Sequence, residues 1–114
     1  MRIVVRGRSM LPTLADGDEV EVRLCAGDEA RVGDVVLVLQ TGAPPVTVLH
    51  RVIARGPDSL LTQGDGVRWP DDPVPFDRVL GVAAVPRRPV YALARRVRAG
   101  LAGFKRRVLQ SKDA

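Results

Sequence analysis

The sequence is poor in residue types on which many functional sites depend. Cys25 is the only cysteine among the 114 residues, and His50 is the only histidine. This composition excludes an intramolecular disulfide and a metal site built on cysteines. We expect Cys25 to be a small, partly buried apolar side chain. Aromatic residues make up only 4% of the chain, so the core must consist mainly of valine, leucine, isoleucine and alanine.

Long hydrophobic runs are also missing. The longest nearly apolar runs, residues 35–39 and 82–85, are far shorter than the ~20 residues that a membrane span requires. The N-terminus does not have the pattern of a secretory signal peptide. We therefore expect a protein that is cytoplasmic or peripheral to the membrane, with no transmembrane segment in this chain.

Positive charge is distributed unevenly along the chain. Residues 1–85 contain 9 Lys and Arg against 12 Asp and Glu, whereas residues 86–114 contain 9 against 1. The length fits a single domain with one hydrophobic core. We therefore predict one domain over residues 1–86 and a separate basic tail over residues 87–114.

The body of the chain has the pattern of short β-strands. Segments rich in valine, isoleucine and leucine alternate with polar residues, as in "EVEVRL", which is typical of half-buried strands. Clusters of Gly, Pro and Asp such as "LADGD" and "TGAPP" separate these segments and predict turns. The predicted strands cover residues 2–6, 19–24, 34–40, 46–55, 60–63 and 79–85. Their spacing predicts a mainly β domain, either a compact barrel or a sandwich.

The basic tail has a different periodicity. After Pro89, apolar residues recur every three or four positions with Arg and Lys between them, which predicts a basic amphipathic α-helix. Gly100 and Gly103 favour a bend or break in it. Three roles remain open: packing on the β domain, peripheral contact with an anionic membrane through residues 87–112, or docking of an acidic partner. We expect no nucleic acid partner, because no nucleic-acid-binding motif is present.

A few side chains in the body could support nucleophilic catalysis. The hydroxyl of Ser9 requires a base to take its proton, and His50 is the only imidazole that could act as a base near neutral pH. A carboxylate that orients the imidazole would complete a triad. The candidates are Asp65, Asp71 and Asp72, which lie in turns after a predicted strand.

The sequences around these residues resemble those of type I signal peptidases. "GRSMLPTLADGDEVEV" is similar to the segment around the serine nucleophile, and "VGDVVLV" to the strand that follows it. "VLHRVIA" resembles the second catalytic segment, and "LTQGDGVRWPDDPVP" followed by "RVLGVA" resembles the third. The histidine followed by Arg-Val-Ile is similar to the endoplasmic-reticulum, archaeal and sporulation-type branch. In the bacterial leader-peptidase branch, a lysine is the base.

This resemblance implies a mainly β catalytic core, similar to that of signal peptidases and the related self-cleaving repressors. It also implies a serine endopeptidase without a metal or organic cofactor. Ser9 corresponds to the nucleophile, His50 to the general base and Asp71 to the carboxylate that orients the base. Asp65 corresponds to the aspartate of the family's Gly-Asp motif. Asp65 or Asp72 could support or replace Asp71.

Residues next to the serine are expected to form the oxyanion hole and the substrate cleft. These residues are Gly7, Arg8, Met10 and Pro12, together with the backbone N–H of Ser9. Gly7 departs from the family, where a serine hydroxyl at this position often helps to hold the oxyanion. The resemblance implies an extended peptide or leader-peptide substrate with small side chains, bound as an added β-strand.

Two features keep other functions open. Gly7 replaces an oxyanion donor, and only eight residues precede Ser9 where signal peptidases usually carry a membrane anchor. The main alternative is therefore an inactive peptide-binding or assembly module on the same scaffold. A second alternative is a soluble protease that processes a cytoplasmic precursor. Trp69, the only tryptophan, is interpreted either as a lid over the core or as a wall of the cleft.

Overall fold

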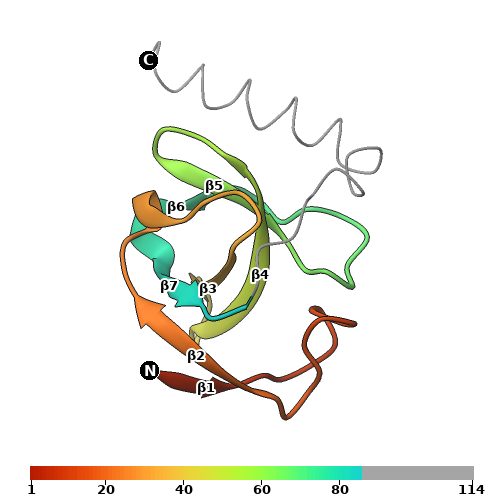
Figure 1. Cartoon of the computed structure of the whole chain (residues 1–114). Coiled ribbons are helices and arrows are strands. Elements are labelled where there is room, and N and C mark those ends of the chain that lie inside the picture. The colour runs from red at the N-terminus through yellow and green to blue at the C-terminus, as the bar shows by residue number, and fades with distance from the viewer. Residues whose placement is uncertain (86–114) are drawn as a thin grey trace.

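The computed structural model describes residues 1–85, which form seven β-strands and two short 3-10 helices. The strands are β1 (Arg2–Val4), β2 (Glu19–Leu24), β3 (Val35–Gln40), β4 (Val46–Arg55), β5 (Ser59–Gln63), β6 (Val74–Pro75) and β7 (Val79–Ala83). The 3-10 helices are η1 (Gly27–Glu29) and η2 (Phe76–Arg78). All strands belong to one antiparallel sheet in the order β1-β2-β7-β3-β4-β5-β6, which curls around a common centre (Figure 1). The predicted mainly β fold is confirmed.

The six predicted strands are all present, and their ends differ from the predictions by at most two residues. The sequence pattern missed β6, which has only two residues and ends in a proline. β6 pairs with β5 through Leu60 opposite Val74 and Ser59 opposite Pro75. The predicted tail helix over residues 87–114 lies outside the described residues. Within the described part of the chain, no helix has the length and apolarity to span a membrane.

Strand β3 separates two clusters of buried apolar side chains. Its residues alternate between the two faces of the sheet, so Val35 and Leu37 belong to one cluster while Val36 and Val38 belong to the other. The first cluster also contains Met10 from the segment between β1 and β2. Burial of this side chain attaches the segment that carries Ser9 to the core.

The register between β4 and β5 distributes polar side chains between the two faces. Arg51 lies opposite Gln63, and Val52 lies opposite Thr62. Residues that lie opposite each other share a face, and neighbours in a strand point to opposite faces. His50 therefore shares one face with Thr62, whereas Arg51 projects from the other face.

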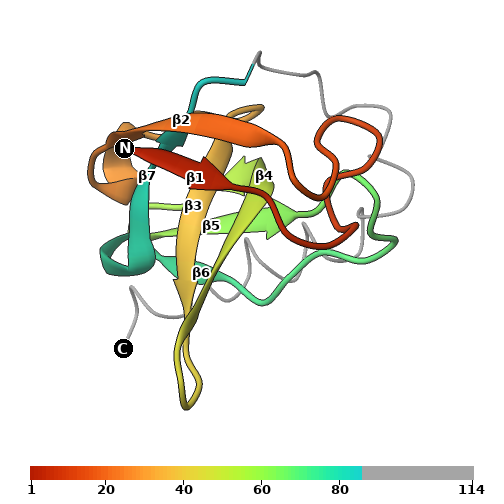
Figure 2. The same ribbon diagram turned by 90° about the horizontal axis from the view of Figure 1, so that it is seen from below.

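The segment that carries Ser9 forms a closed loop between β1 and β2. Val5 N–H donates to the carbonyl of Asp18 over 2.8 Å, and Gly17 N–H donates to the carbonyl of Val5 over 2.8 Å. Gly17 has a φ of 91°, a backbone conformation that favours glycine. We call residues 5–18 the serine loop. It lies beside the connection between β5 and β6, as two views show (Figures 1 and 2).

Candidate active site

His50 and Asp71 are in direct contact. His50 Nδ1 lies 2.5 Å from Asp71 Oδ2. The histidine side chain is buried within β4, whereas the Asp71 side chain retains 25% of its exposure. A carboxylate accepts hydrogen bonds, so the contact favours the tautomer in which Nδ1 carries the proton. Nε2 of the neutral ring is then left as an acceptor, which is the form that a general base requires.

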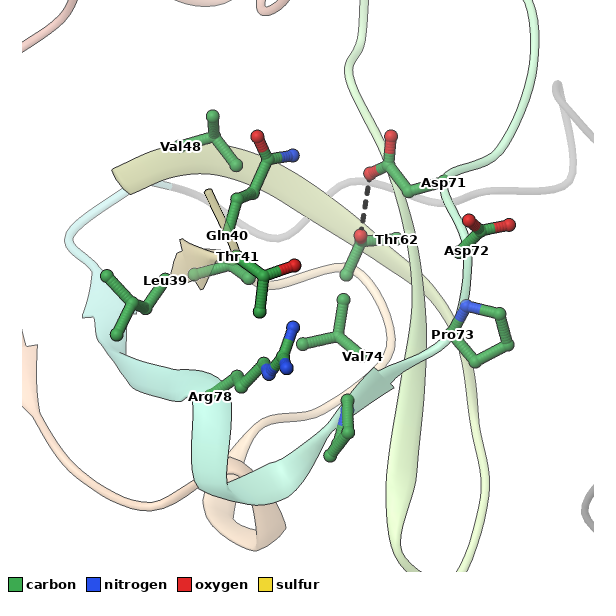
Figure 3. Close-up of a pocket in the computed structure, with 12 residues that line it drawn as sticks. Leu39, Gln40, Thr41, Val48, Thr62, Asp71, Asp72, Pro73, Val74 and Arg78 are labelled. Atoms are coloured by element: carbon green, nitrogen blue, oxygen red, sulfur yellow. Dashed lines mark hydrogen bonds between the residues drawn. The ribbon is translucent and has the colours of Figure 1, made fainter. Parts of the chain in front are cut away.

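A second side chain, missed by the sequence analysis, contacts the same carboxylate. Thr62 Oγ1 donates to Asp71 Oδ2 over 2.7 Å, as Figure 3 shows. Asp71 N–H also donates to the carbonyl oxygen of Thr62 over 2.8 Å. Asp72 is exposed, and its carboxylate points away from Thr62 (Figure 3). Asp71, and not its neighbour, is the carboxylate in contact with His50.

Asp65 belongs to a different cluster of charged side chains. Arg51 Nε and Nη2 donate to its two carboxylate oxygens over 3.1 and 2.7 Å, and Thr13 Oγ1 donates to Oδ2 over 2.5 Å. Arg51 Nη1 also donates to the carbonyl of Gly33 over 2.8 Å. The Arg51 and Asp65 side chains are only 1% and 2% exposed. Asp65 therefore links Thr13 of the serine loop to Arg51 of β4. Its carboxylate contacts Arg51 instead of His50.

Ser9 is half-buried in the serine loop, and its backbone lies beside the imidazole. Gly66 N–H donates to the carbonyl oxygen of Ser9 over 2.9 Å. A Cβ atom on Gly64 would clash with this oxygen and would lie 3.1 Å from Nε2 of His50. The carbonyl oxygen of Ser9 and Nε2 of His50 therefore both lie next to Gly64.

The Ser9 hydroxyl and His50 Nε2 share no hydrogen bond in the described part of the chain. The backbone N–H of Ser9 likewise has no acceptor among residues 1–85. Hydrogen bonds between catalytic groups are often long in structures without substrate and shorten when substrate binds. Within residues 1–85, His50 Nε2, the Ser9 hydroxyl and the Ser9 N–H have no hydrogen-bond partner.

The other residues predicted around Ser9 have different environments. Gly7 has a φ of 87°, and its N–H donates to Asp16 Oδ1 over 2.8 Å, so this N–H is engaged within the loop. Met10 is buried, and its Sδ accepts from Asp65 N–H over 3.4 Å. Arg8 and Pro12 are exposed. Of these four residues, Met10 has the clearest structural role, because it joins the loop to the core.

Trp69 is 64% exposed. The guanidinium of Arg68 lies over its ring, 5.6 Å from the centroid. This exposure excludes the interpretation of Trp69 as a lid over the core.

A small cavity of about 150 Å³ borders Ser9. Its lining comes from β1, the serine loop, β3 and β4, and combines apolar side chains with polar groups, including those of Arg6, Ser9 and Thr47. The lining residues are Ile3, Val4, Val5, Arg6, Ser9, Met10, Leu37, Thr47, Val48 and Leu49. A second cavity of about 340 Å³ is bordered by Thr62 and Asp71 (Figure 3). In residues 1–85, no three His, Cys, Asp or Glu side chains are grouped so that they could hold a metal ion.

A comparison with models of known protein families identifies the family of the chain. The family model described as signal peptidase, peptidase S26, matches residues 1–94. This match includes every described strand and all the residues of the candidate site. No curated protein and no solved structure matches the chain.

Proposed function

Because the chain belongs to the signal peptidase family, peptidase S26, we propose that it is a serine endopeptidase that cleaves a leader or signal-type peptide. Ser9 is the nucleophile, His50 the general base and Asp71 the carboxylate that orients the base. The observation that carries the proposal is the 2.5 Å contact between His50 Nδ1 and Asp71 Oδ2. Nε2 and the Ser9 carbonyl both lie close to the position that a Cβ atom on Gly64 would take.

The proposed reaction follows from these positions. Ser9 Oγ attacks the scissile carbonyl while Nε2 of His50 takes the hydroxyl proton. His50 then gives this proton to the leaving amine, and water hydrolyses the acyl-enzyme by the same route. Asp71 stabilises the imidazolium that forms in each step. The free N–H of Ser9 donates to the oxyanion.

The cavity beside Ser9 supports a substrate with small side chains near the scissile bond. Its volume of about 150 Å³ fits a small side chain better than a large one. β1 is an edge strand of the sheet, and its residues line the cavity. An extended peptide could therefore bind as an added strand beside it.

The test is hydrolysis of extended peptides with alanine near the scissile bond, followed by mass spectrometry. Ser9→Ala and His50→Gln are expected to lower kcat by about a thousandfold or more, because each removes a member of the triad. A rate unchanged in His50→Gln would contradict the proposed mechanism.

A second candidate function is a peptide-binding or assembly module without catalysis. Two observations favour it: Gly7 N–H is already bonded to Asp16, and Ser9 is not hydrogen-bonded to His50 in the described residues. Calorimetric binding of a peptide whose mass stays unchanged over days would support it. A gene for a small precursor peptide next to this one would instead favour a soluble processing protease.

A further inference from the structure

Asp71 follows an irregular stretch of chain and makes two hydrogen bonds with Thr62. β5 ends at Gln63 and β6 begins at Val74, so no strand pairing includes Asp71. The carbonyl of Thr62 accepts from Asp71 N–H over 2.8 Å, and the Thr62 hydroxyl donates to Asp71 Oδ2 over 2.7 Å. One residue therefore holds both the backbone and the carboxylate of Asp71.

Thr62 is itself fixed relative to His50. It is buried in β5 and lies opposite Val52 of β4, two residues along the strand from His50. Thr62 Oγ1 and His50 Nδ1 both lie within hydrogen-bond distance of the same oxygen, Asp71 Oδ2. The threonine therefore sets the carboxylate against the strand that carries the imidazole.

We propose that Thr62 is a positioning residue for the Asp71–His50 pair. Its hydroxyl holds the Asp71 carboxylate in the orientation that accepts from Nδ1 and so fixes the tautomer of His50. Without the hydroxyl, Oδ2 loses one of two donors, and the carboxylate, 25% exposed, can turn toward water. The catalytic consequence of this role rests on the proposed peptidase function, whereas the effect on the imidazole does not.

The single histidine makes the imidazole directly observable. In ¹⁵N-labelled protein, every imidazole nitrogen signal belongs to His50, and a proton shared between Nδ1 and a carboxylate gives a far-downfield proton resonance. We expect this resonance in the wild type and its loss in Asp71→Asn. We also expect its loss in Thr62→Val, which keeps the branched shape but removes the hydroxyl, and its return in Thr62→Ser.

Matched controls separate positioning from folding. Thr41 is an exposed threonine that lines the cavity bordered by Thr62 and Asp71 (Figure 3). Thr41→Val removes its hydroxyl and is expected to keep the downfield resonance of His50. The backbone amide spectrum of Thr62→Val should change only around residues 62 and 71. If Thr62→Val does not fold, Thr62→Ala provides the same comparison with Thr62→Ser. A wild-type His50 resonance in a folded Thr62→Val or Thr62→Ala variant overturns the proposal.

Kinetics then distinguish this inference from the proposed function. In assays with a peptide that the wild type cleaves, Thr62→Val is expected to lower kcat about tenfold with little change in KM. A tenfold loss of rate corresponds to the loss of about one hydrogen bond to a charged group. Thr62→Ser should recover most of this loss. If the resonance depends on Thr62 but no peptide is cleaved, the positioning role holds and the peptidase function fails. If Ser9→Ala abolishes cleavage while Thr62→Val keeps both the resonance and kcat, the positioning role fails alone.

Discussion

At the scale of single residues, two neighbouring aspartates have different environments. Asp71 contacts His50 and Thr62, whereas Asp72 is exposed. The resemblance to signal peptidases indicated Asp71 but left Asp65 and Asp72 open. Residues 64–73 contain no strand, so no periodicity shows the direction of each side chain. Only the three-dimensional structure separates these carboxylates.

The two neighbouring aspartates are therefore expected to differ in their effect on peptide hydrolysis. Asp71→Asn should lower kcat by about three to four orders of magnitude, because the amide can hold the imidazole in the wrong tautomer. Asp72→Asn adds the same amide one residue later and should leave kcat within about twofold of the wild type, since surface changes have small effects. Equal losses in both variants would contradict this assignment.

Cys25 is partly buried, as expected from the sequence. Burial raises the pKa of its thiol above the ordinary value, and Arg23 acts in the opposite direction. A raised pKa means that less thiolate is present at neutral pH, and the thiolate is the reactive form. Alkylation by iodoacetamide should therefore be slower than in the urea-unfolded chain, and its pH profile should be displaced to higher pH. Identical pH profiles for the folded and unfolded chains would show that burial does not protect the thiol.

At the scale of elements, the site depends on close contact between two loops. The stretch after β5 contacts the serine loop through Gly66 N–H and the carbonyl of Ser9, and through Asp65 and Thr13. The hydrophobic pattern within each segment was enough to predict every described strand except β6. The sequence did not reveal that Arg51 binds Asp65, because this pairing depends on how β4 and the two loops meet in space.

Gly64 is expected to tolerate no side chain. The methyl group in Gly64→Ala would clash with the Ser9 carbonyl and crowd Nε2 of His50. We expect a loss of about 1–3 kcal/mol in the free energy of unfolding and a larger proportional loss of kcat. Gly42→Ala in the β3–β4 connection is the control, since its methyl group would meet only the carbonyl of Pro44 at 3.4 Å. Urea denaturation and peptide hydrolysis measure the two effects, and full activity in Gly64→Ala would contradict the predicted contact.

The Arg51–Asp65 pair is expected to matter more for stability than for chemistry. Asp65→Asn removes the carboxylate that accepts from Nε and Nη2 of the buried Arg51, which should cost about 3–5 kcal/mol in the free energy of unfolding. Chemical denaturation measures this loss. Asp77→Asn, an exposed change in η2, is the control. A stable Asp65→Asn protein would mean that the remaining hydrogen bonds of Arg51 are sufficient.

At the scale of the whole molecule, charge divides the chain into two parts. Residues 1–85 have an excess of acidic residues, and residues 86–114 have 9 basic residues and one acidic residue. We propose that the basic part contacts an anionic membrane. In flotation assays, the full chain should associate with vesicles that contain anionic lipid, and this association should weaken with added salt. A chain of residues 1–86, which retains every described strand, should stay in the soluble fraction.

Neutral vesicles provide the control for the flotation assay. If the full chain fails to float with anionic vesicles at low salt, the membrane proposal is wrong. If residues 1–86 float equally well, the attachment comes from the β domain instead of the basic part.

The position of β7 also has a consequence for the order in which the protein becomes active during synthesis. β7 is the last described strand to leave the ribosome, yet it lies between β2 and β3 near the middle of the sheet. A nascent chain that ends before Val79 carries every residue of the proposed triad but lacks the strand that joins both halves of the sheet. Contacts between distant parts of a chain form late in folding. For the peptidase function proposed above, activity should therefore begin only after the whole β domain has been translated.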